Sequence, residues 1–241
     1  MAIEIKAENK VTRQDTFRIH PSDVKVGRNS RMIAAPDYAA TVLARAVSIA
    51  KSGQLQPAEV RRADDKTLVM VSGYTRRDAI LLLREGFDAV DPDTGDTVRF
   101  HKPDATLWVK VTDVSADDAF LRSIKENLER KDTTDLQDAL AQNELRVTMG
   151  WTDTKIARFY GKSNQNRVSD LEKLLRLPDA VQQKVHKGEM ALSIALLTLE
   201  LSDEERADII NRSADAGGKV SGPALKQLLR DLYDKKGGTP E

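Results

Sequence analysis

Two short stretches of the chain offer glycine turns, and one of them adds arginine side chains, features that suit phosphate binding. One spans residues 53–57 and contains Gln56, and the other spans residues 73–79 and carries Arg76 and Arg77. Guanidinium groups and the backbone amides exposed at glycine turns both donate hydrogen bonds to phosphate oxygens. The second stretch also lies between a strand pattern and a helix pattern, where a helix N-terminus adds its own amides. The spacing alone fits an ordinary surface turn as well, and both interpretations stay open.

A third stretch, residues 126–130, offers oxygen ligands for a divalent cation. The Glu126 carboxylate and the Asn127 side-chain amide are donors of the kind that Mg²⁺ accepts. Glu126 and Arg130 also lie four residues apart on a predicted helix, where a surface ion pair contributes about 0.3 kcal/mol. Such a pair leaves Asn127 unexplained, because asparagine lowers helix propensity without burying apolar surface.

A helix-turn-helix pattern follows, and its second helix is equipped to read DNA. A short apolar-faced helix ends near Phe159, Gly161 permits a sharp turn, and an amphipathic helix then runs over residues 165–177. Recognition helices place polar side chains at their start, where base edges lie. Here the turn and the helix start supply Lys162, Ser163, Asn164, Gln165, Asn166 and Arg167.

The charge of this segment supports the same interpretation. Residues 151–187 contain eight Lys or Arg against four Asp or Glu, an excess of four in a chain whose formal net charge is zero. Phosphate contacts require such a local excess. An ordinary helical bundle with a solvated basic face is the alternative.

Composition excludes several classes of protein. The 241 residues are 40% hydrophobic and 32% charged, which fits one or two globular domains. The absence of cysteine removes disulfides, thiolate catalysis and Cys-ligated zinc, and three scattered histidines do not suggest zinc either. No signal peptide and no run of transmembrane length is found, so we expect a cytoplasmic protein without membrane partners.

The secondary-structure elements that must position these residues follow two patterns, one of mixed strands and helices and one of helices alone, which together predict an α+β chain. Over residues 1–114, short apolar runs such as 68–71 and 107–111 alternate with helix patterns at 38–52 and 78–85, which predicts a small mixed α/β domain. A turn at residues 91–96 marks a hairpin tip.

The rest of the chain is predicted to be helical. Residues 115–213 contain successive helix patterns that open on capping residues such as Thr134 with Gln137 and Ser202 with Glu205, which predicts an all-α domain. Residues 214–241 read as a hinge, a short helix and a tail.

Taken in order, these stretches resemble the ParB/Spo0J family of chromosome and plasmid partition proteins. The likeness runs from about Val24 to Ala191. The residues that match the family pattern are Asn29 with Arg31, residues 48–57, Gly73 with Arg76 and Ala79, residues 126–132, Gly161-Lys162-Ser163, Val168-Ser169 and residues 174–178. The resemblance implies a ParB/sulfiredoxin-like N-terminal domain that binds CTP and Mg²⁺, then a helix-turn-helix domain that reads a palindromic DNA site as a homodimer.

The resemblance also implies roles for individual residues. Glu126 and Asn127 would lie at the magnesium ion, and Glu126 would be the residue most needed for slow CTP hydrolysis. The nucleotide would be held by Arg31, Gln56, Gly73, Thr75, Arg76, Arg77, Asn127 and Arg130.

The chain departs from the family pattern at several places. Tyr74 and Thr75 replace the glutamate and first arginine of the family's Gly-Glu-Arg-Arg box, so that only Arg76 matches a family phosphate-binding arginine. Residues 88–104 look like an insertion. One extra residue before Val168 shifts the register of the reading helix. No segment resembles the family's ParA-binding stretch, which leaves a ParA-type ATPase a doubtful partner.

These departures leave other functions open. A nucleotide-independent transcriptional or replication regulator on the same scaffold is favoured by the altered box around Tyr74 and Thr75. A ParB-like nuclease ranks last, because no paired carboxylates at metal spacing stand out beyond Glu126. The absence of cysteine excludes sulfiredoxin activity.

Overall fold

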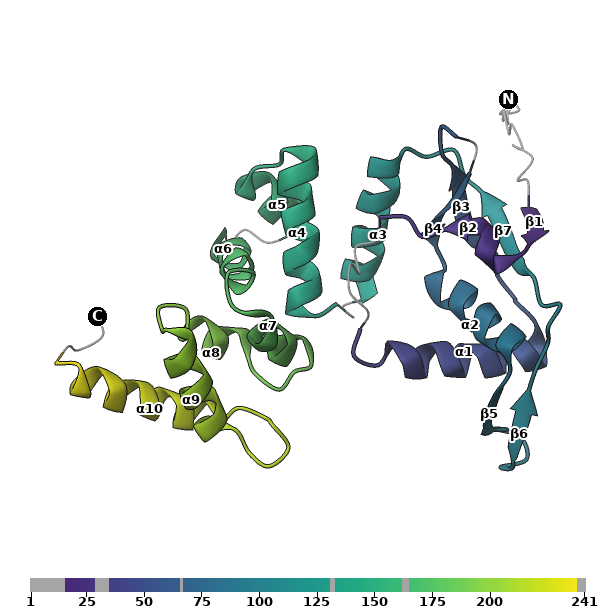
Figure 1. The fold of residues 1–241 in the computed structure, drawn as a ribbon. Coiled ribbons are helices and arrows are strands. Elements are labelled where there is room, and N and C mark those ends of the chain that lie inside the picture. Colours follow the sequence, from purple (N-terminus) through teal and green to yellow (C-terminus); the bar gives the residue numbers. More distant parts are fainter. Residues whose placement is uncertain (1–15, 29–34, 66, 131–132, 162–164, 238–241) are drawn as a thin grey trace, which may run out of the picture. The chain divides into compact units, whose positions relative to one another are not determined.

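The computed structural model describes residues 16–28, 35–65, 67–130, 133–161 and 165–237. The chain divides into two compact units (Figure 1), one of residues 1–28 and 39–120 and the other of residues 29–38 and 121–241. The division falls inside helix α3 (Ala116–Arg130), six residues after the predicted boundary at 114.

A five-stranded sheet forms the first unit, with the order β1-β7-β3-β4-β2. β7 runs parallel to β3 and antiparallel to β1, while β4 runs antiparallel to β3 and parallel to β2. The strands are β1 (Thr16–Ile19), β2 (Val24–Lys25), β3 (Ala58–Arg62), β4 (Leu68–Ser72) and β7 (Leu107–Val111). The mixed α/β architecture, which was predicted from strand patterns alternating with helix patterns, is confirmed.

Two helices and a short 3-10 turn complete the sheet unit. Helix α1 (Tyr38–Ser52) buries Val42, Ala46 and Ile49, whose spacing places them on one face. Helix α2 (Tyr74–Glu85) buries Ala79, Ile80 and Leu83, and the 3-10 turn η1 (Pro21–Asp23) contacts it. The predicted start of α2 at residue 78 is wrong by four residues, because the carbonyl of Gly73 already accepts hydrogen bonds from the Arg76 and Arg77 amides.

A two-stranded hairpin, β5 (Phe87–Val90) and β6 (Thr97–Phe100), extends from this unit (Figure 1). The rings of Phe87 and Phe100 stack with their centroids 5.5 Å apart. Lys51, at the end of α1, forms ion pairs with Asp91 and Asp93 in the hairpin tip. The predicted turn over residues 91–96 is therefore confirmed, and α1 anchors it.

The second unit is helical. After α3 come α4 (Asp135–Met149), α5 (Asp153–Phe159), α6 (Gln165–Leu174), α7 (Asp179–His186), α8 (Leu192–Leu196), α9 (Asp203–Ser213) and α10 (Gly222–Lys235). Both predicted capping boxes are present, from Thr134 to Gln137 and from Ser202 to Glu205. Each box satisfies amides that a helix start would otherwise leave without partners.

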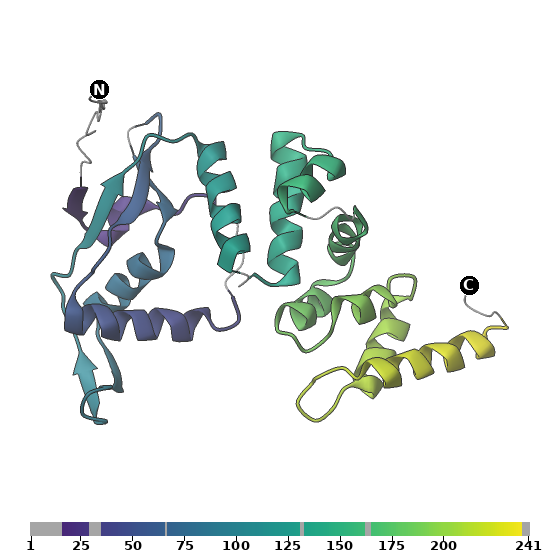
Figure 2. The ribbon, with the colours of Figure 1, turned by 180° about the vertical axis from the view of Figure 1, so that it is seen from behind.

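One hydrophobic core is shared by helix α4 and by the helices from α6 through α10. It includes Leu136 of α4, Leu171 and Leu174 of α6 and Leu225 of α10, all with at most 2% of their surface exposed. Figure 2 shows α9 and α10 lying side by side at the C-terminal end of this unit, in agreement with their contacts. The final helix is therefore part of the helical core.

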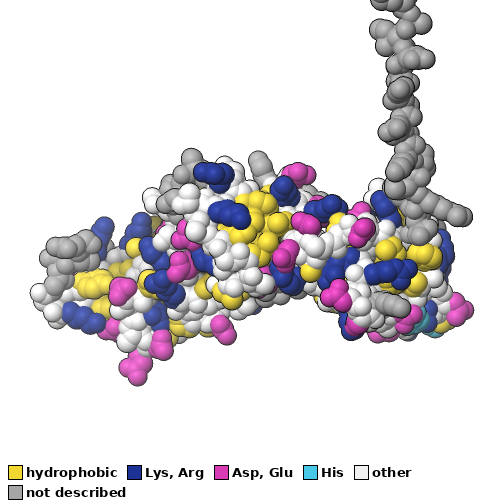
Figure 3. All heavy atoms as spheres, turned by 90° about the horizontal axis from the view of Figure 1, so that it is seen from above, with side chains coloured by type: hydrophobic (Ala, Val, Ile, Leu, Met, Phe, Trp, Pro, Cys, Tyr) yellow, Lys and Arg dark blue, Asp and Glu magenta, His cyan; other side chains and the backbone are white. Residues whose placement is uncertain are grey.

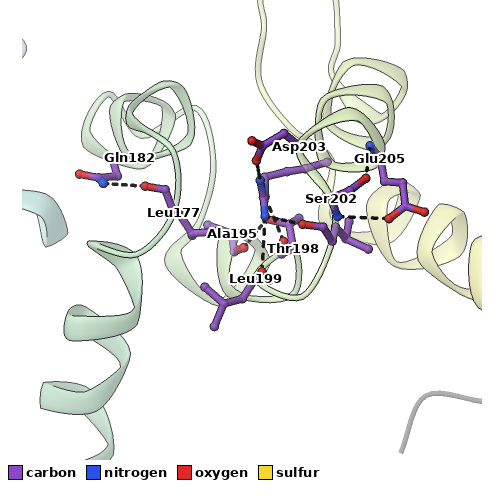
Figure 4. A network of polar contacts seen from close by, with 10 residues as sticks. Leu177, Gln182, Ala195, Thr198, Leu199, Ser202, Asp203 and Glu205 are labelled. Atoms are coloured by element: carbon purple, nitrogen blue, oxygen red, sulfur yellow. Dashed lines mark hydrogen bonds and ion pairs between the residues drawn. The ribbon is translucent and has the colours of Figure 1, made fainter.

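A buried arginine, Arg206, fixes the junction between α8 and α9, and Figure 4 shows two of its partners, Thr198 and Asp203. The Arg206 guanidinium donates to the carbonyl oxygens of Thr198 at 3.0 Å and Leu201 at 2.6 Å, and it also pairs with Asp203. Only 7% of Arg206 is exposed. Burying a charge is costly unless it is hydrogen-bonded, so these acceptors are what make the position possible.

Candidate functional site

The Gly73 turn joins β4 to α2 and packs tightly against β3. Gly73 has φ 91° and ψ 25°, a left-handed conformation that favours glycine. A Cβ atom at this position would come within 2.8 Å of the Ala58 Cβ atom. The backbone conformation and the close approach to β3 therefore both require glycine here.

The turn brings three of the predicted nucleotide-binding residues together. The Arg76 Nη2 atom donates a hydrogen bond of 3.2 Å to the Gln56 Oε1 atom. The Arg76 Nη1 atom would lie 3.0 Å from a Cβ on Gly73, so the guanidinium group extends back over the turn. The first turn of α2 contains no acidic residue. A guanidinium group at an acid-free helix N-terminus is an arrangement that favours an anion.

Gln54 positions this loop, and the sequence analysis did not single it out. Its side-chain amide bonds to the backbone of Trp108 in both directions, with Nε2 to the carbonyl at 2.7 Å and Oε1 to the amide at 2.9 Å. Nε2 also donates to the carbonyl oxygen of Gln56 at 2.8 Å. Gln54 therefore holds the loop that carries Gln56 against the first half of β7.

Tyr74 and Arg77, two neighbours of Arg76, have partners within the fold. The Tyr74 hydroxyl donates to the Met70 carbonyl at 3.2 Å, and burial raises the pKa of Tyr74 to about 12. Arg77 donates through Nε to the Pro21 carbonyl at 3.1 Å and pairs with Asp78 at 2.9 Å. The hydrogen bond of Arg77 to Pro21 thus links α2 to η1. Thr75 is half-buried in the first turn of α2.

The predicted metal ligands lie on α3, in the part of that helix that belongs to the second unit. Glu126 is exposed, and Asn127 is 9% exposed. Within the residues that the structure describes, no three acidic or histidine side chains gather into a metal-binding group. A carboxylate and an amide still suit Mg²⁺, which usually takes one or two protein oxygens and completes its shell with phosphate and water. Arg31 and the side chain of Arg130 lie outside the described residues.

The predicted helix-turn-helix is formed by α5 and α6. Thr152 caps α5, and Gly161 after it has φ 66°. Lys162, Ser163, Asn164 and the side chain of Gln165 lie outside the described residues. Asn166 is exposed at the start of α6, whereas Arg167 forms an ion pair with Asp135 at the start of α4.

Arg146 holds the pair of helices to α4 and was missed by the sequence analysis. Its Nε atom donates to the Asp153 carboxylate of α5 at 2.7 Å, and its Nη2 atom lies 4.0 Å from the Glu172 carboxylate of α6. Only 18% of the side chain is exposed. One arginine therefore contacts both helices of the candidate reader, which sequence spacing alone does not reveal.

Aromatic and lysine side chains gather beside α5. The Lys155 ammonium lies 4.1 Å from the centre of the Trp151 ring, and Trp151 meets Phe159 edge-on at 5.3 Å. Val147, at the end of α4, is 75% exposed. Figure 3, which looks down on the ends of α4 and α5, shows hydrophobic surface bordered by Lys and Arg side chains. In the described residues, no helix is long and apolar enough to cross a membrane.

Comparison with known proteins finds a family match within the helical unit and relatives that are similar over more of the chain. Residues 131–221 match the family model of the ParB HTH domain. A probable chromosome-partitioning protein ParB of Chlamydia trachomatis is 34% identical over 108 residues, which cover 44% of this chain and 38% of that protein.

A probable chromosome-partitioning protein ParB of Pseudomonas putida is 28% identical over 190 residues, 78% of this chain and 58% of its own length. The likeness therefore extends beyond the helix-turn-helix into the α/β unit. Residues 131–221 thus match the ParB HTH domain, and the chain is similar to probable chromosome-partitioning proteins ParB over 78% of its length in the longer of these two alignments. It spans less than two thirds of the length of these relatives.

Among solved structures, the C-terminally truncated ParB of Caulobacter crescentus complexed to the centromeric parS site is similar to this chain. The alignment covers 89% of this chain and 99% of that one, with 21% identity and a TM-score of 0.47.

Proposed function

We propose that the chain is a sequence-specific double-stranded DNA-binding protein of the partition type, controlled by CTP and Mg²⁺. The observation that carries the nucleotide part is the meeting of Gln56, Gly73 and Arg76 at the start of α2. The ParB HTH match over α4 to α9 supports the DNA part. Association with the nucleoid or a plasmid in the cytoplasm follows from that DNA binding.

In this proposal the Arg76 guanidinium and the first amides of α2 bind the nucleotide's phosphates, and Gln56 holds Arg76 in place. Glu126 and Asn127 would hold the magnesium ion, which would supply positive charge. Glu126 is also the residue needed for slow hydrolysis. CTP would favour self-association of two copies around DNA, to the extent that it binds the closed state more tightly than the open one.

Calorimetry with CTP and Mg²⁺ tests the nucleotide site. Arg76→Ala removes a charged hydrogen bond to phosphate, worth about 2–3 kcal/mol, and so weakens binding roughly 30- to 150-fold. Arg84→Ala is the matched control, because it removes the same charge from the far end of α2, where Arg84 bonds to the Ala105 carbonyl. Equal losses in both variants, or none in Arg76→Ala, reject the site.

A nucleotide-independent DNA-binding regulator is the second candidate. It is favoured by the engagement of Tyr74 with Met70 and of Arg77 with Pro21, which commits both side chains to the fold. A thermal-shift panel with CTP, ATP, GTP and no nucleotide separates the two. A ligand at about 100 times its dissociation constant stabilises the chain by about 2.7 kcal/mol, so a shift with CTP alone supports our proposal, and no shift with any nucleotide supports the regulator.

A further inference from the structure

A groove of about 300 Å³ runs between α9 and α10. Its lining comes entirely from these two helices: Glu204, Glu205, Asp208, Ile209 and Arg212 from α9, and Leu228, Asp231, Leu232 and Lys235 from α10.

The floor of the groove is apolar and continuous with the core. Ile209 is 3% exposed, and Leu228 and Leu232 are half-buried one helical turn apart on α10. Leu225 and Leu229, on the adjoining face of α10, are buried in the core. The floor is therefore held in place by packed side chains and can receive apolar groups spaced along a helix.

The rim of the groove is acidic. Four carboxylates face two cations, and Asp208 is already paired with Arg212 at 3.0 Å, as Glu205 is with Lys236. In the described part of the chain, Glu204 and Asp231 form no ion pair, although Asp231 accepts a hydrogen bond from Gln227 at 2.9 Å. The walls thus present two carboxylates that are free to pair with cations, one on each helix.

We propose that this groove docks a short basic amphipathic helix of a partner protein. Leucine-like side chains of that helix would contact Leu228 and Leu232, and its Lys or Arg side chains would pair with Glu204 and Asp231. The charge of the rim disfavours the two other occupants. DNA is repelled by carboxylates, and a second copy docked through the same face would set the acidic rim against itself.

The test uses the full chain and a fluorescent peptide of about four helical turns, with leucine at helix spacing and lysine elsewhere. Fluorescence anisotropy is measured with the parent and with the double variant Glu204→Lys/Asp231→Lys. Asp64→Lys/Glu85→Lys is the control, because it reverses the same number of exposed carboxylates in the other unit. Losing both ion pairs should weaken binding about tenfold or more, and the control should bind within about twofold of the parent.

Leu228→Ala supplies a second arm that leaves the charge unchanged and also weakens binding. Circular dichroism of each variant confirms that it is folded. Three results would overturn the proposal: no saturable binding by the parent, equal losses in the two double variants, or equal affinity for a scrambled peptide of the same composition. Dimers of the parent that dissociate in Glu204→Lys/Asp231→Lys would instead assign the groove to a second copy.

Discussion

At Gly73, both the left-handed backbone conformation and the lack of room for a Cβ atom make glycine important for stability. Gly73→Ala should destabilise the chain, because a left-handed alanine costs about 1–2 kcal/mol and its Cβ also contacts β3. Gly95→Ala is the control, since Gly95 has φ 79° and no atom within 4 Å of a Cβ. Urea unfolding of both variants should show the larger loss for Gly73→Ala, and equal losses would contradict the close approach.

Two tyrosines allow a comparison of how a hydrogen-bonded hydroxyl and a buried hydroxyl without a partner contribute to stability. The Tyr160 hydroxyl is buried and has no hydrogen-bond partner among the described residues, and burial raises its pKa above the usual range. Tyr160→Phe should therefore be neutral or stabilising, whereas Tyr74→Phe, which loses the bond to Met70, should cost about 1 kcal/mol. Thermal unfolding compares them. A cost for Tyr160→Phe as large as that for Tyr74→Phe would show that the Tyr160 hydroxyl has a partner.

Among the secondary-structure elements, the β5–β6 hairpin is linked to α1 by ion pairs of one lysine, Lys51. Hydrogen bonds from Lys51 lower the pKa of Asp91 below 3.8, and those to Asp91 and Asp93 raise the pKa of Lys51 above 10.5. The lowered Asp91 pKa gives stability that is present above pH 3.8 and lost as the pH falls through the folded-state pKa. The raised Lys51 pKa gives stability that is present below pH 10.5 and lost as the pH rises through its folded-state value.

Lys51→Met should therefore have a lower melting temperature than the parent at neutral pH. The difference should shrink as the pH falls well below 3.8, where Asp91 is protonated in both states. Melting curves across that range provide the measurement. A difference that does not change with pH would mean that Lys51 acts through packing of its side chain alone.

The helix-turn-helix gives a prediction about Arg167, which pairs with Asp135 in the free chain. If Arg167 exchanges this carboxylate for a DNA phosphate, Arg167→Met should lower the slope of log affinity against log salt by about 0.9. Asp135→Asn removes the competitor and should leave that slope unchanged while binding at least as tightly. An unchanged slope in Arg167→Met would assign the residue to the fold only.

Local features were predictable from the sequence, and contacts between distant segments were not. The Thr134–Gln137 and Ser202–Glu205 boxes were found because both partners lie within one helical turn. Gln54 was missed because its partner, Trp108, lies 54 residues away, and Arg146 because it joins three helices. The start of α2 was placed late because Gly73 serves as the residue that precedes the helix, a role that composition does not show.

At the scale of the whole molecule, two units carry separate chemistry. The α/β unit holds the Gln56–Gly73–Arg76 turn, and the helical unit holds α5, α6 and the acidic groove between α9 and α10. Helix α3 has residues in both units, and its part in the second unit carries Glu126 and Asn127, the residues proposed to hold the magnesium ion.

The most direct test is amine-reactive crosslinking of the full chain, with and without CTP, Mg²⁺ and double-stranded DNA. We predict that the crosslinked dimer increases when CTP, Mg²⁺ and DNA are all present, and that Arg76→Ala abolishes the increase while Arg84→Ala retains it. A dimer fraction that CTP does not change in the parent chain would contradict nucleotide control of DNA binding.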